Sequence, residues 1–299
     1  MIDHCSFTWA LDETVALWDK WNNVTLSNNI IAEALYEKPT GNTSGYGLLL
    51  GQTGGGRATV VGNLLAHNQA RNPLNRSYSS VFVNNVVYNA RGQSSTIQSM
   101  NGVATQNTFI GNVYIPGPDT AHTTPVNVSV GTDEYALPPA SKLYLADNVG
   151  FQAVKSTEWS LASTGVPTSM RASLPPIWPA GLTRLPTADG VVLQHVLKHV
   201  GARPAYRDPV DARIVKSVRD LTVRIVNCVS PNGTERCERN AGGWPTLASN
   251  KRTLMLPAEH KAVTPSGYTK LELWLHDMAA QVEGRPHSPP APPVLASGQ

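Results

Sequence analysis

The chain has 299 residues, of which 15% are charged and 7% are Phe, Trp or Tyr. This length can bury a core in one or two domains, and the composition excludes a coiled coil or a largely disordered chain. A formal net charge of +3 is too small to indicate nucleic acid binding, and no apolar run reaches the roughly 18 residues of a membrane helix. We therefore expect neither nucleic acid nor a membrane as a partner.

Short β-rich segments, each with an asparagine before two apolar residues, recur through residues 1–150. Asn63 and Asn85 are 22 residues apart, and Asn107 follows after another 22. A period in the low twenties fits three short strands and three turns, which is one coil of a parallel β-helix. Asparagine tolerates the left-handed backbone of tight bends, and stacked amides hydrogen-bond from coil to coil. The alternative, an antiparallel sandwich, predicts spacings of about 8–12 residues.

The repeat fades after residue 150. Residues 151–190 contain several prolines and are expected to wrap the solenoid as an extended segment. Residues 191–284 form a helical C-terminal extension, with helices expected at 191–201, after the N-cap residue Asp208, and at 268–280. The Pro-rich tail at 285–299 is expected to be disordered.

Three cysteines are present. Cys5 lies in an alternating strand pattern and is expected to be a small buried hydrophobe. Cys228 and Cys237 bracket a turn-rich loop that a disulfide would close, although spacing alone does not decide between a disulfide and two free thiols.

Two arginines five residues apart make the most informative motif, Arg71-x-Pro73-x-x-Arg76. It follows residues 58–68, which read as one rung of the β-helix. A guanidinium binds a carboxylate in a planar, bidentate geometry that lysine does not reproduce. The motif therefore suits a site that grips an acidic polymer.

Several short motifs follow one another in order through residues 1–150. They are Ile2-Asp3-His4-Cys5-Ser6-Phe7, Val24-Thr25-Leu26-Ser27-Asn28-Asn29, Leu48-Leu49-Leu50-Gly51, His67-Asn68, the arginine motif and Asn84-Asn85-Val86-Val87-Tyr88. Together they resemble the extracellular pectate lyases of polysaccharide lyase family 1, and residues 193–219 are similar to the C-terminal extension of bacterial members. The resemblance implies an all-β, right-handed parallel β-helix with a small helical C-terminal extension. It also implies a secreted protein, although residues 1–5 lack the basic start and apolar segment of a signal peptide.

The resemblance further implies that the chain cleaves polygalacturonate or pectin by β-elimination, in which a base removes the proton α to a uronate carboxylate. It implies that Arg71 is the base and that Arg76 holds the carboxylate. Neighbouring cations, including calcium, favour the neutral guanidinium that a base requires. A lysine between the strands at 24–27 and 48–50 binds substrate in the family, and Lys38 is the candidate here.

A calcium site is the remaining implication. Asp12 stands where the family has one acidic ligand, and Ala16 stands where it has a second, which leaves Glu13 or Asp19 as substitutes. Further family ligands lie upstream of Ile2, so we expect several N-terminal coils and part of the calcium site to be missing and activity to be impaired. The coil end at Met1 is then an open β-edge, which predicts a homodimer.

Two other functions are left open by the sequence. One is a non-catalytic β-helix that binds acidic polysaccharide. The other is a β-helix hydrolase with two carboxylates about 5–9 Å apart, for which Asp12, Glu13 and Glu33 are the nearby candidates. Trp9, Trp18 and Trp21 are candidates either for stacking on sugar rings or for the core.

Overall fold

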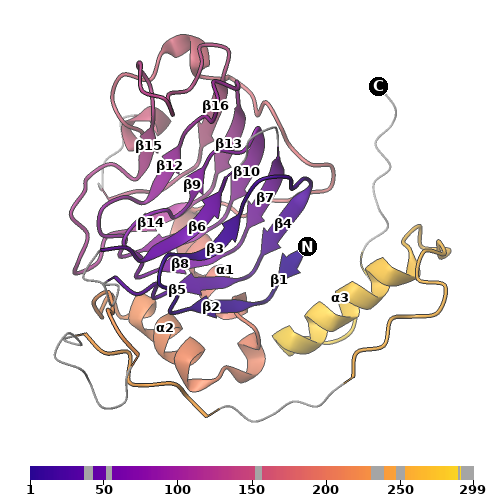
Figure 1. The fold of residues 1–299 in the computed structure, drawn as a ribbon. Coiled ribbons are helices and arrows are strands. Elements are labelled where there is room, and N and C mark those ends of the chain that lie inside the picture. The colour runs from indigo at the N-terminus through magenta and orange to yellow at the C-terminus, as the bar shows by residue number, and fades with distance from the viewer. Residues whose placement is uncertain are drawn as a thin grey trace.

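The protein is a solenoid of stacked coils in which each full coil adds one strand to each of three sheets (Figure 1). The structure, a computed structural model, describes residues 1–36, 43–51, 56–151, 157–229, 239–246, 253–288 and 290. Neighbouring strands in every sheet are parallel, as a chain that winds in one direction requires. The predicted right-handed parallel β-helix is confirmed.

The three sheets run side by side along the solenoid axis. The first holds six strands, β1-β4-β7-β10-β13-β16, at Ile2–Asp3, Val24–Ser27, Arg57–Val61, Ser79–Val83, Gln106–Ile110 and Lys142–Ala146. The second holds β2-β5-β8-β11-β14 at Ser6–Thr8, Ile30–Ala32, Leu64–Ala66, Val86–Tyr88 and Val113–Ile115. The third holds β3-β6-β9-β12-β15 at Glu13–Leu17, Tyr46–Leu50, Leu74–Asn75, Ser95–Ile97 and Val126–Val128.

The corner between the first and second sheets repeats in every coil after the first, where His4 and Cys5 stand in its place. One residue with positive φ turns the chain, and the next residue is an asparagine whose amide bonds to the following coil. The turning residues are Asn28, Gly62, Asn84, Gly111 and Asp147, with φ between 52° and 67°. The ladder consists of Asn29, Asn63, Asn85, Asn112 and Asn148. The side-chain oxygen of each asparagine after Asn29 accepts from the backbone and side-chain nitrogens of the asparagine one coil before, at 2.9 to 3.0 Å, whereas that of Asn29 accepts from the Cys5 backbone at 2.9 Å.

The predicted 22-residue step from Asn85 to Asn107 is wrong. The ladder continues at Asn112, which is 27 residues after Asn85, because the chain between β12 and β13 is longer in this coil. Asn107 lies instead within β13, where its side-chain oxygen accepts from Asn75 at 2.7 Å and from Ser80 at 2.7 Å. Coil length is therefore variable, while the corner is not.

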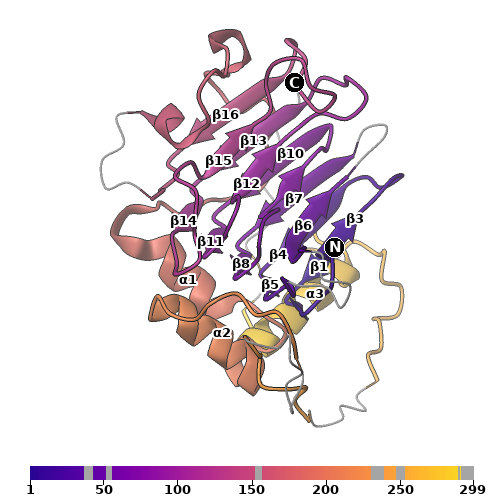
Figure 2. The same cartoon turned by 60° about the vertical axis from the view of Figure 1, so that its left-hand side comes forward.

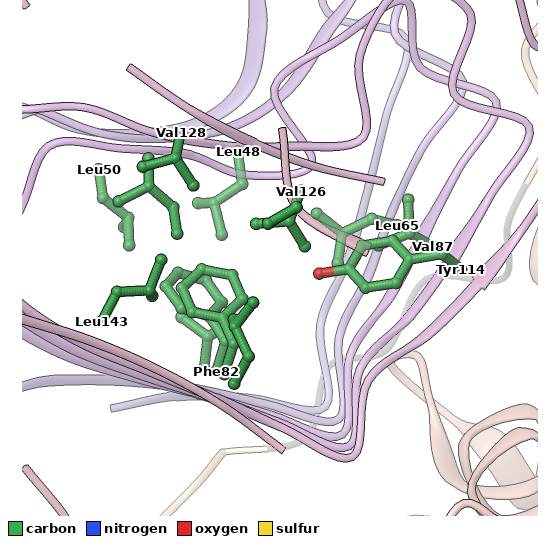
Figure 3. Packing of buried hydrophobic residues seen from close by; sticks show 14 of the residues in the cluster. Leu48, Leu50, Leu65, Phe82, Val87, Tyr114, Val126, Val128 and Leu143 are labelled. Atoms are coloured by element: carbon green, nitrogen blue, oxygen red, sulfur yellow. The ribbon is translucent and has the colours of Figure 1, made fainter. Parts of the chain in front are cut away.

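The core fills the space between the sheets with side chains that point inward from all three (Figure 3). Phe82 and Phe109 stack on the inner face of the first sheet, with ring centroids 4.5 Å apart and planes inclined by 25°. Leu48 and Leu50 of β6 face them from the third sheet. Burying such a side chain stabilises the fold by roughly 1.5–3 kcal/mol, and stacking like residues in successive coils repeats that contribution along the axis.

Three α-helices follow the solenoid: α1 (Val191–His199), α2 (Pro209–Arg219) and α3 (Lys270–Glu283). All three lie where the sequence predicts them. Short 3₁₀ helices occur at Glu158–Leu161, Thr168–Met170, Ala188–Gly190 and Pro204–Tyr206. Asp208 caps α2 by accepting from the backbone of Val210 and Asp211, and α3 begins with a capping box between Thr269 and Glu272.

Helices α1 and α2 cover the outer face of the second sheet (Figure 2). Their apolar stripes pack on a row of outward-facing residues from β5, β8 and β11, which are Ile30, Ala32, Leu64, Ala66, Val86 and Tyr88. This explains why those strands read as nearly continuous apolar runs, since they are buried on both faces.

Polar side chains also tie α2 to the solenoid. Glu33 is fully buried and pairs with Arg213 of α2, whose Nη2 lies 2.7 Å from Glu33 Oε2. His67, likewise fully buried, contacts Ser217 at 2.8 Å through Nε2. Burial lowers the pKa of His67 to about 4, so the imidazole is neutral at pH 7. His67 therefore has a structural role.

Helix α3 lies beside β1 at the first coil (Figure 1). Glu283, at its last turn, has Oε1 3.2 Å from His4 Nε2, while His4 Nδ1 lies 2.7 Å from Asp3. A cavity of about 690 Å³ separates the helix from the coil, between residues such as Met1 and Trp274. The predicted homodimer through this coil end, and the division of the chain at residues 150, 190 and 284, stay predictions.

The remaining predictions concern cysteines and membranes. Cys5 is a free thiol, only partly buried. Cys228 is disulfide-bonded, whereas Cys237 and most of the tail at 285–299 lie outside the described residues. Within the described part of the chain, no helix has the length and apolar character needed to cross a bilayer.

Candidate active site

A groove runs along the outer face of the third sheet. Its floor is a column of residues in register, Ala16, Leu49, Leu74 and Thr96, taken from β3, β6, β9 and β12. Alternate residues of a strand face opposite sides of a sheet. Leu48 and Leu50 enter the core, so Leu49 between them faces outward and, with Ala16 and Leu74, makes the floor apolar up to Thr96.

Arg71 stands at one side of this floor, just before β9. Its backbone has φ of 61°, and its carbonyl accepts from Leu48 of the neighbouring coil at 2.7 Å. A side chain at Gly47 would place a Cβ 2.8 Å from that carbonyl, so this close approach of the two coils requires glycine. The Arg71 side chain is 29% exposed, pairs with the Glu13 carboxylate, and lies over the Tyr46 ring at 3.8 Å.

Arg76 stands at the opposite side, just after β9. Its Nε donates to Gln98 Oε1 at 2.8 Å, and its guanidinium lies 4.0 Å from the centre of the Tyr135 ring. The short strand β9 thus holds one guanidinium at each end. Both predicted arginines face the same groove.

The electrostatic setting of both arginines is unusual. Burial lowers the pKa of Arg71, with the Asp12 carboxylate opposing that shift and the charge of Arg76 adding to it. Burial also lowers the pKa of Arg76, opposed mainly by Tyr135 and Glu134. Two partly desolvated cations near one another make the neutral form of either one less costly.

Two cavities of about 440 Å³ each flank the arginines along the solenoid axis. Arg71, Leu74 and Arg76 line both of them. The cavity toward the first coil, here called the acidic cavity, is completed by Glu13, Ala16, Trp18 and Leu49. The cavity toward the later coils, here called the amide cavity, is completed by Tyr46, Gln69, Ala70, Gly92, Gln93, Thr96 and Gln98. An extended chain laid along the axis would cross the arginines between the two.

The tryptophans divide between groove and scaffold. Trp18 is 56% exposed and lines the acidic cavity. Its ring lies so close to Gly51 that a Cβ there would overlap it. Trp9 is buried and donates to Glu33 at 3.0 Å, and Trp21 donates to the Gly51 carbonyl at 2.7 Å. Of the three, Trp18 alone lines the groove.

The predicted calcium ligands do not form a recognisable metal site. Asp12 is exposed, Glu13 is paired with Arg71, and Ala16 lies on the groove floor. The described residues contain no group of three or more His, Cys, Asp or Glu side chains placed to hold a metal. Calcium takes six to eight oxygen ligands, which these two carboxylates do not supply, so the residues present do not fit a calcium ion by themselves.

Sequence reasoning missed the groups that surround the arginines. Tyr46, Tyr135 and Gln98 come from other coils, and they meet the arginines only because the coils stack. Lys38, the predicted substrate-binding lysine, lies outside the described residues. The acidic pair proposed for a hydrolase is not supported by Glu33, which is fully buried against α2, away from the groove.

Comparison with known proteins agrees with the fold. No protein-family model matches the chain. Over 289 residues it is 28% identical to a probable pectate lyase C of Aspergillus flavus, and over 293 residues 26% identical to that of Aspergillus terreus, covering 93% of this chain in both cases. A probable pectate lyase C of Emericella nidulans is 36% identical over 123 residues, which cover 41% of this chain and 26% of that protein. The chain spans 65% of the length of the two Aspergillus relatives. In its right-handed parallel β-helix and along nearly its whole length, the chain is similar to these probable pectate lyases.

Proposed function

We propose that the protein is a secreted polysaccharide lyase that cleaves polygalacturonate by β-elimination in the groove on the third sheet. The observation that carries the proposal is the placement of Arg71 and Arg76 at the two ends of β9, both lining the same two cavities. A polymer of uronates needs both a cation for its carboxylate and a base beside the adjacent carbon. The names of the fungal relatives favour the same chemistry.

In this mechanism Arg76 holds the carboxylate of the reacting galacturonate, and neutral Arg71 takes the proton from C5. The electron pair of the broken C5–H bond forms the C4–C5 double bond, and the C4–O bond breaks. The leaving oxygen takes a proton from water, and Arg71 returns its own proton to solvent. The lowered pKa of Arg71 supports its role as the base.

The ion pair with Glu13 opposes this role, because a nearby carboxylate stabilises the charged guanidinium. We propose that the incoming polymer replaces Glu13 as the neighbour of Arg71. The calcium requirement implied by the family stays a prediction. No step of the mechanism passes through a metal ion.

The test is formation of the C4–C5 unsaturated product, followed by ultraviolet absorbance, with polygalacturonate as substrate. Arg71→Lys should lower kcat by about 100-fold or more, because removal of a general base typically costs that much. Arg57→Lys, at an exposed arginine of β7 outside the groove, is the matched control and should keep the rate. Equal rates in the two variants would remove Arg71 from the chemistry.

Two other outcomes separate the remaining functions. Retention on a polygalacturonate matrix without any product, with and without added calcium, would indicate a non-catalytic binding protein. New reducing ends without unsaturation would indicate hydrolysis. The ion pair between Glu13 and Arg71 is the observation that keeps the binding function open, since it holds Arg71 in its charged form.

A further inference from the structure

Two histidines stand one turn apart on helix α1. His195 and His199 are four positions apart, which places their side chains on the same face of the helix. Their ring centres lie 4.5 Å from each other, with the ring planes inclined by 34°. His195 is exposed, and the His199 side chain retains 18% of its exposed surface. A small ion in solution can therefore reach the pair.

The nitrogens of these two rings are not used by the fold. Within the part of the chain that the structure describes, no hydrogen bond joins either imidazole to another group. The Glu283 carboxylate of α3 faces His199, with Oε2 3.8 Å from Nδ1, which is beyond hydrogen-bond distance. A carboxylate on that side favours the proton on Nδ1 and leaves the lone pair of Nε2 free to bind a metal ion.

The separation of the rings matches what a shared ion requires. An ion bound about 2 Å from one nitrogen of each ring, at the angle between neighbouring ligands of a square-planar or tetrahedral site, leaves the ring centres about 4.5 to 5 Å apart. Val192 and Val196 of the same helix are fully buried against the second sheet. The backbone that carries the pair is therefore fixed, so binding the second ring costs little additional entropy.

The chemistry of the donors selects the class of ion. Imidazole nitrogen suits Cu²⁺, Ni²⁺ and Zn²⁺, whereas Ca²⁺ and Mg²⁺ prefer oxygen ligands. The described residues contain no group of three or more His, Cys, Asp or Glu side chains placed to hold a metal. The pair therefore supplies two ligands, and water completes the coordination.

We propose that His195 and His199 form a two-ligand binding site for a late first-row transition-metal ion, with Cu²⁺ bound more tightly than Ni²⁺ or Zn²⁺. The helix that carries the site covers the second sheet, so the inference does not depend on the lyase reaction proposed for the groove on the third sheet. The bound ion adds positive charge beside Glu283 at the last turn of α3. Metal binding should therefore raise the thermal midpoint of the folded protein.

The experiment is a calorimetric titration of metal-free protein without an affinity tag, with Cu²⁺ as the probe. His195→Gln and His199→Gln should each lower the affinity of the tightest-bound ion by about tenfold or more, because that ion keeps a single protein ligand. His260→Gln is the matched control, since no other histidine lies within four positions of it, and it should keep the wild-type affinity. Excess Ca²⁺ should not displace the ion.

A spacing variant tests the geometry of the pair. Gln194→His combined with His195→Gln keeps the number of histidines in α1 but places them five positions apart, on different faces of the helix. This variant should lose as much affinity as His195→Gln. The proposal is overturned if the spacing variant binds Cu²⁺ as tightly as wild type, or if Ca²⁺ displaces Cu²⁺.

A spectrum of wild-type protein keeps the proposal testable even if a variant fails to fold. Electron paramagnetic resonance of the tightest-bound Cu²⁺ should show hyperfine lines from two imidazole nitrogens, and from one in His199→Gln. A wild-type spectrum with fewer than two imidazole nitrogens would refute the site. Loss of lyase activity, or its absence, has no bearing on any of these measurements.

Discussion

The Glu13 carboxylate reaches across one coil of the solenoid to pair with the Arg71 guanidinium. Glu13 lies in β3 and is in register with Tyr46 of β6, and Arg71 lies over the ring of that tyrosine at 3.8 Å. Acid, aromatic ring and guanidinium therefore come from three successive coils. The arrangement holds the proposed base in place and, at the same time, favours its protonated form.

The first prediction concerns this pair. Glu13→Gln keeps the shape of the side chain and removes its charge, so the neutral form of Arg71 becomes easier to reach. The basic group that limits the pH profile of kcat/KM should then titrate about one pH unit lower. Glu259→Gln, at an exposed glutamate near α3, should leave the profile unchanged. Loss of activity in Glu13→Gln that added calcium restores would instead make Glu13 a metal ligand.

The second prediction concerns Trp18, which is exposed in the acidic cavity. Trp18→Ala should weaken the binding of de-esterified oligogalacturonate by about fivefold to tenfold, because an aromatic platform of this size is lost. Gly51→Ala should weaken it similarly, since its Cβ would displace the Trp18 ring. Trp244→Ala removes a tryptophan that is 70% exposed and packs edge-on against Trp9. Calorimetry that finds the same loss in Trp244→Ala would rule out a specific role for Trp18.

The third prediction concerns the asparagine ladder. The Asn85 amide donates to the Val60 carbonyl at 2.9 Å, and its oxygen accepts from the Asn63 backbone at 3.0 Å. Asn85→Ala leaves the Val60 carbonyl and the Asn63 backbone N–H buried without these partners. The substitution should therefore lower the free energy of unfolding by about 3 kcal/mol. Asn22→Ala, at an exposed position, should change it by less than about 0.5 kcal/mol. Equal midpoints in urea would show that the ladder adds nothing to stability.

The fourth prediction concerns α3. Burial opposes the charge on His4, but the Asp3 and Glu283 carboxylates outweigh it and raise the pKa of His4 from 6.5 to about 9. The pKa of Glu283 falls from 4.5 to about 2, because hydrogen bonds and charge from His4 and Arg285 outweigh burial. The His4 contribution is complete below pH 6.5 and is lost as the pH rises through about 9. The Glu283 contribution is complete above pH 4.5 and is lost as the pH falls through about 2.

Thermal unfolding followed by tryptophan fluorescence, with Trp274 on α3 as a local reporter, measures this dependence. Stability should be highest between about pH 4.5 and 6.5 and should fall on both sides. In His4→Gln the fall toward pH 9 should largely disappear, whereas His287→Gln, at a histidine 69% exposed in its side chain, should retain it. Persistence of that fall in His4→Gln would assign it to other groups.

The corner between the first and second sheets was readable from the sequence, because from the second coil onward it carries an asparagine at a defined point of the turn. The coil length was not, since the stretch between β12 and β13 is longer than its counterpart between β9 and β10 and no repeated pattern marks the difference. That is why Asn107 was placed on the ladder in place of Asn112.

Prediction of the site is limited in the same way, because only residues that are close in the sequence leave a local signal. Arg71 and Arg76 belong to one short segment, so their proximity is local and the sequence predicts it. Gln98 and Tyr135 follow β12 and β15 in later coils, and they reach Arg76 only through the stacking of those coils. The C-terminal helices were predictable because their caps and apolar stripes are local signals.

Glu33 has a consequence for the order in which the protein matures during synthesis. Its carboxylate is enclosed in an early coil, yet its partner Arg213 follows 180 residues later. A nascent chain that has emerged only through β16 lacks α2, and with it both the counter-charge of Glu33 and the helix that packs over it. This face of the second sheet should therefore stay open to water on the ribosome until α2 arrives, so that the acid is enclosed together with its partner.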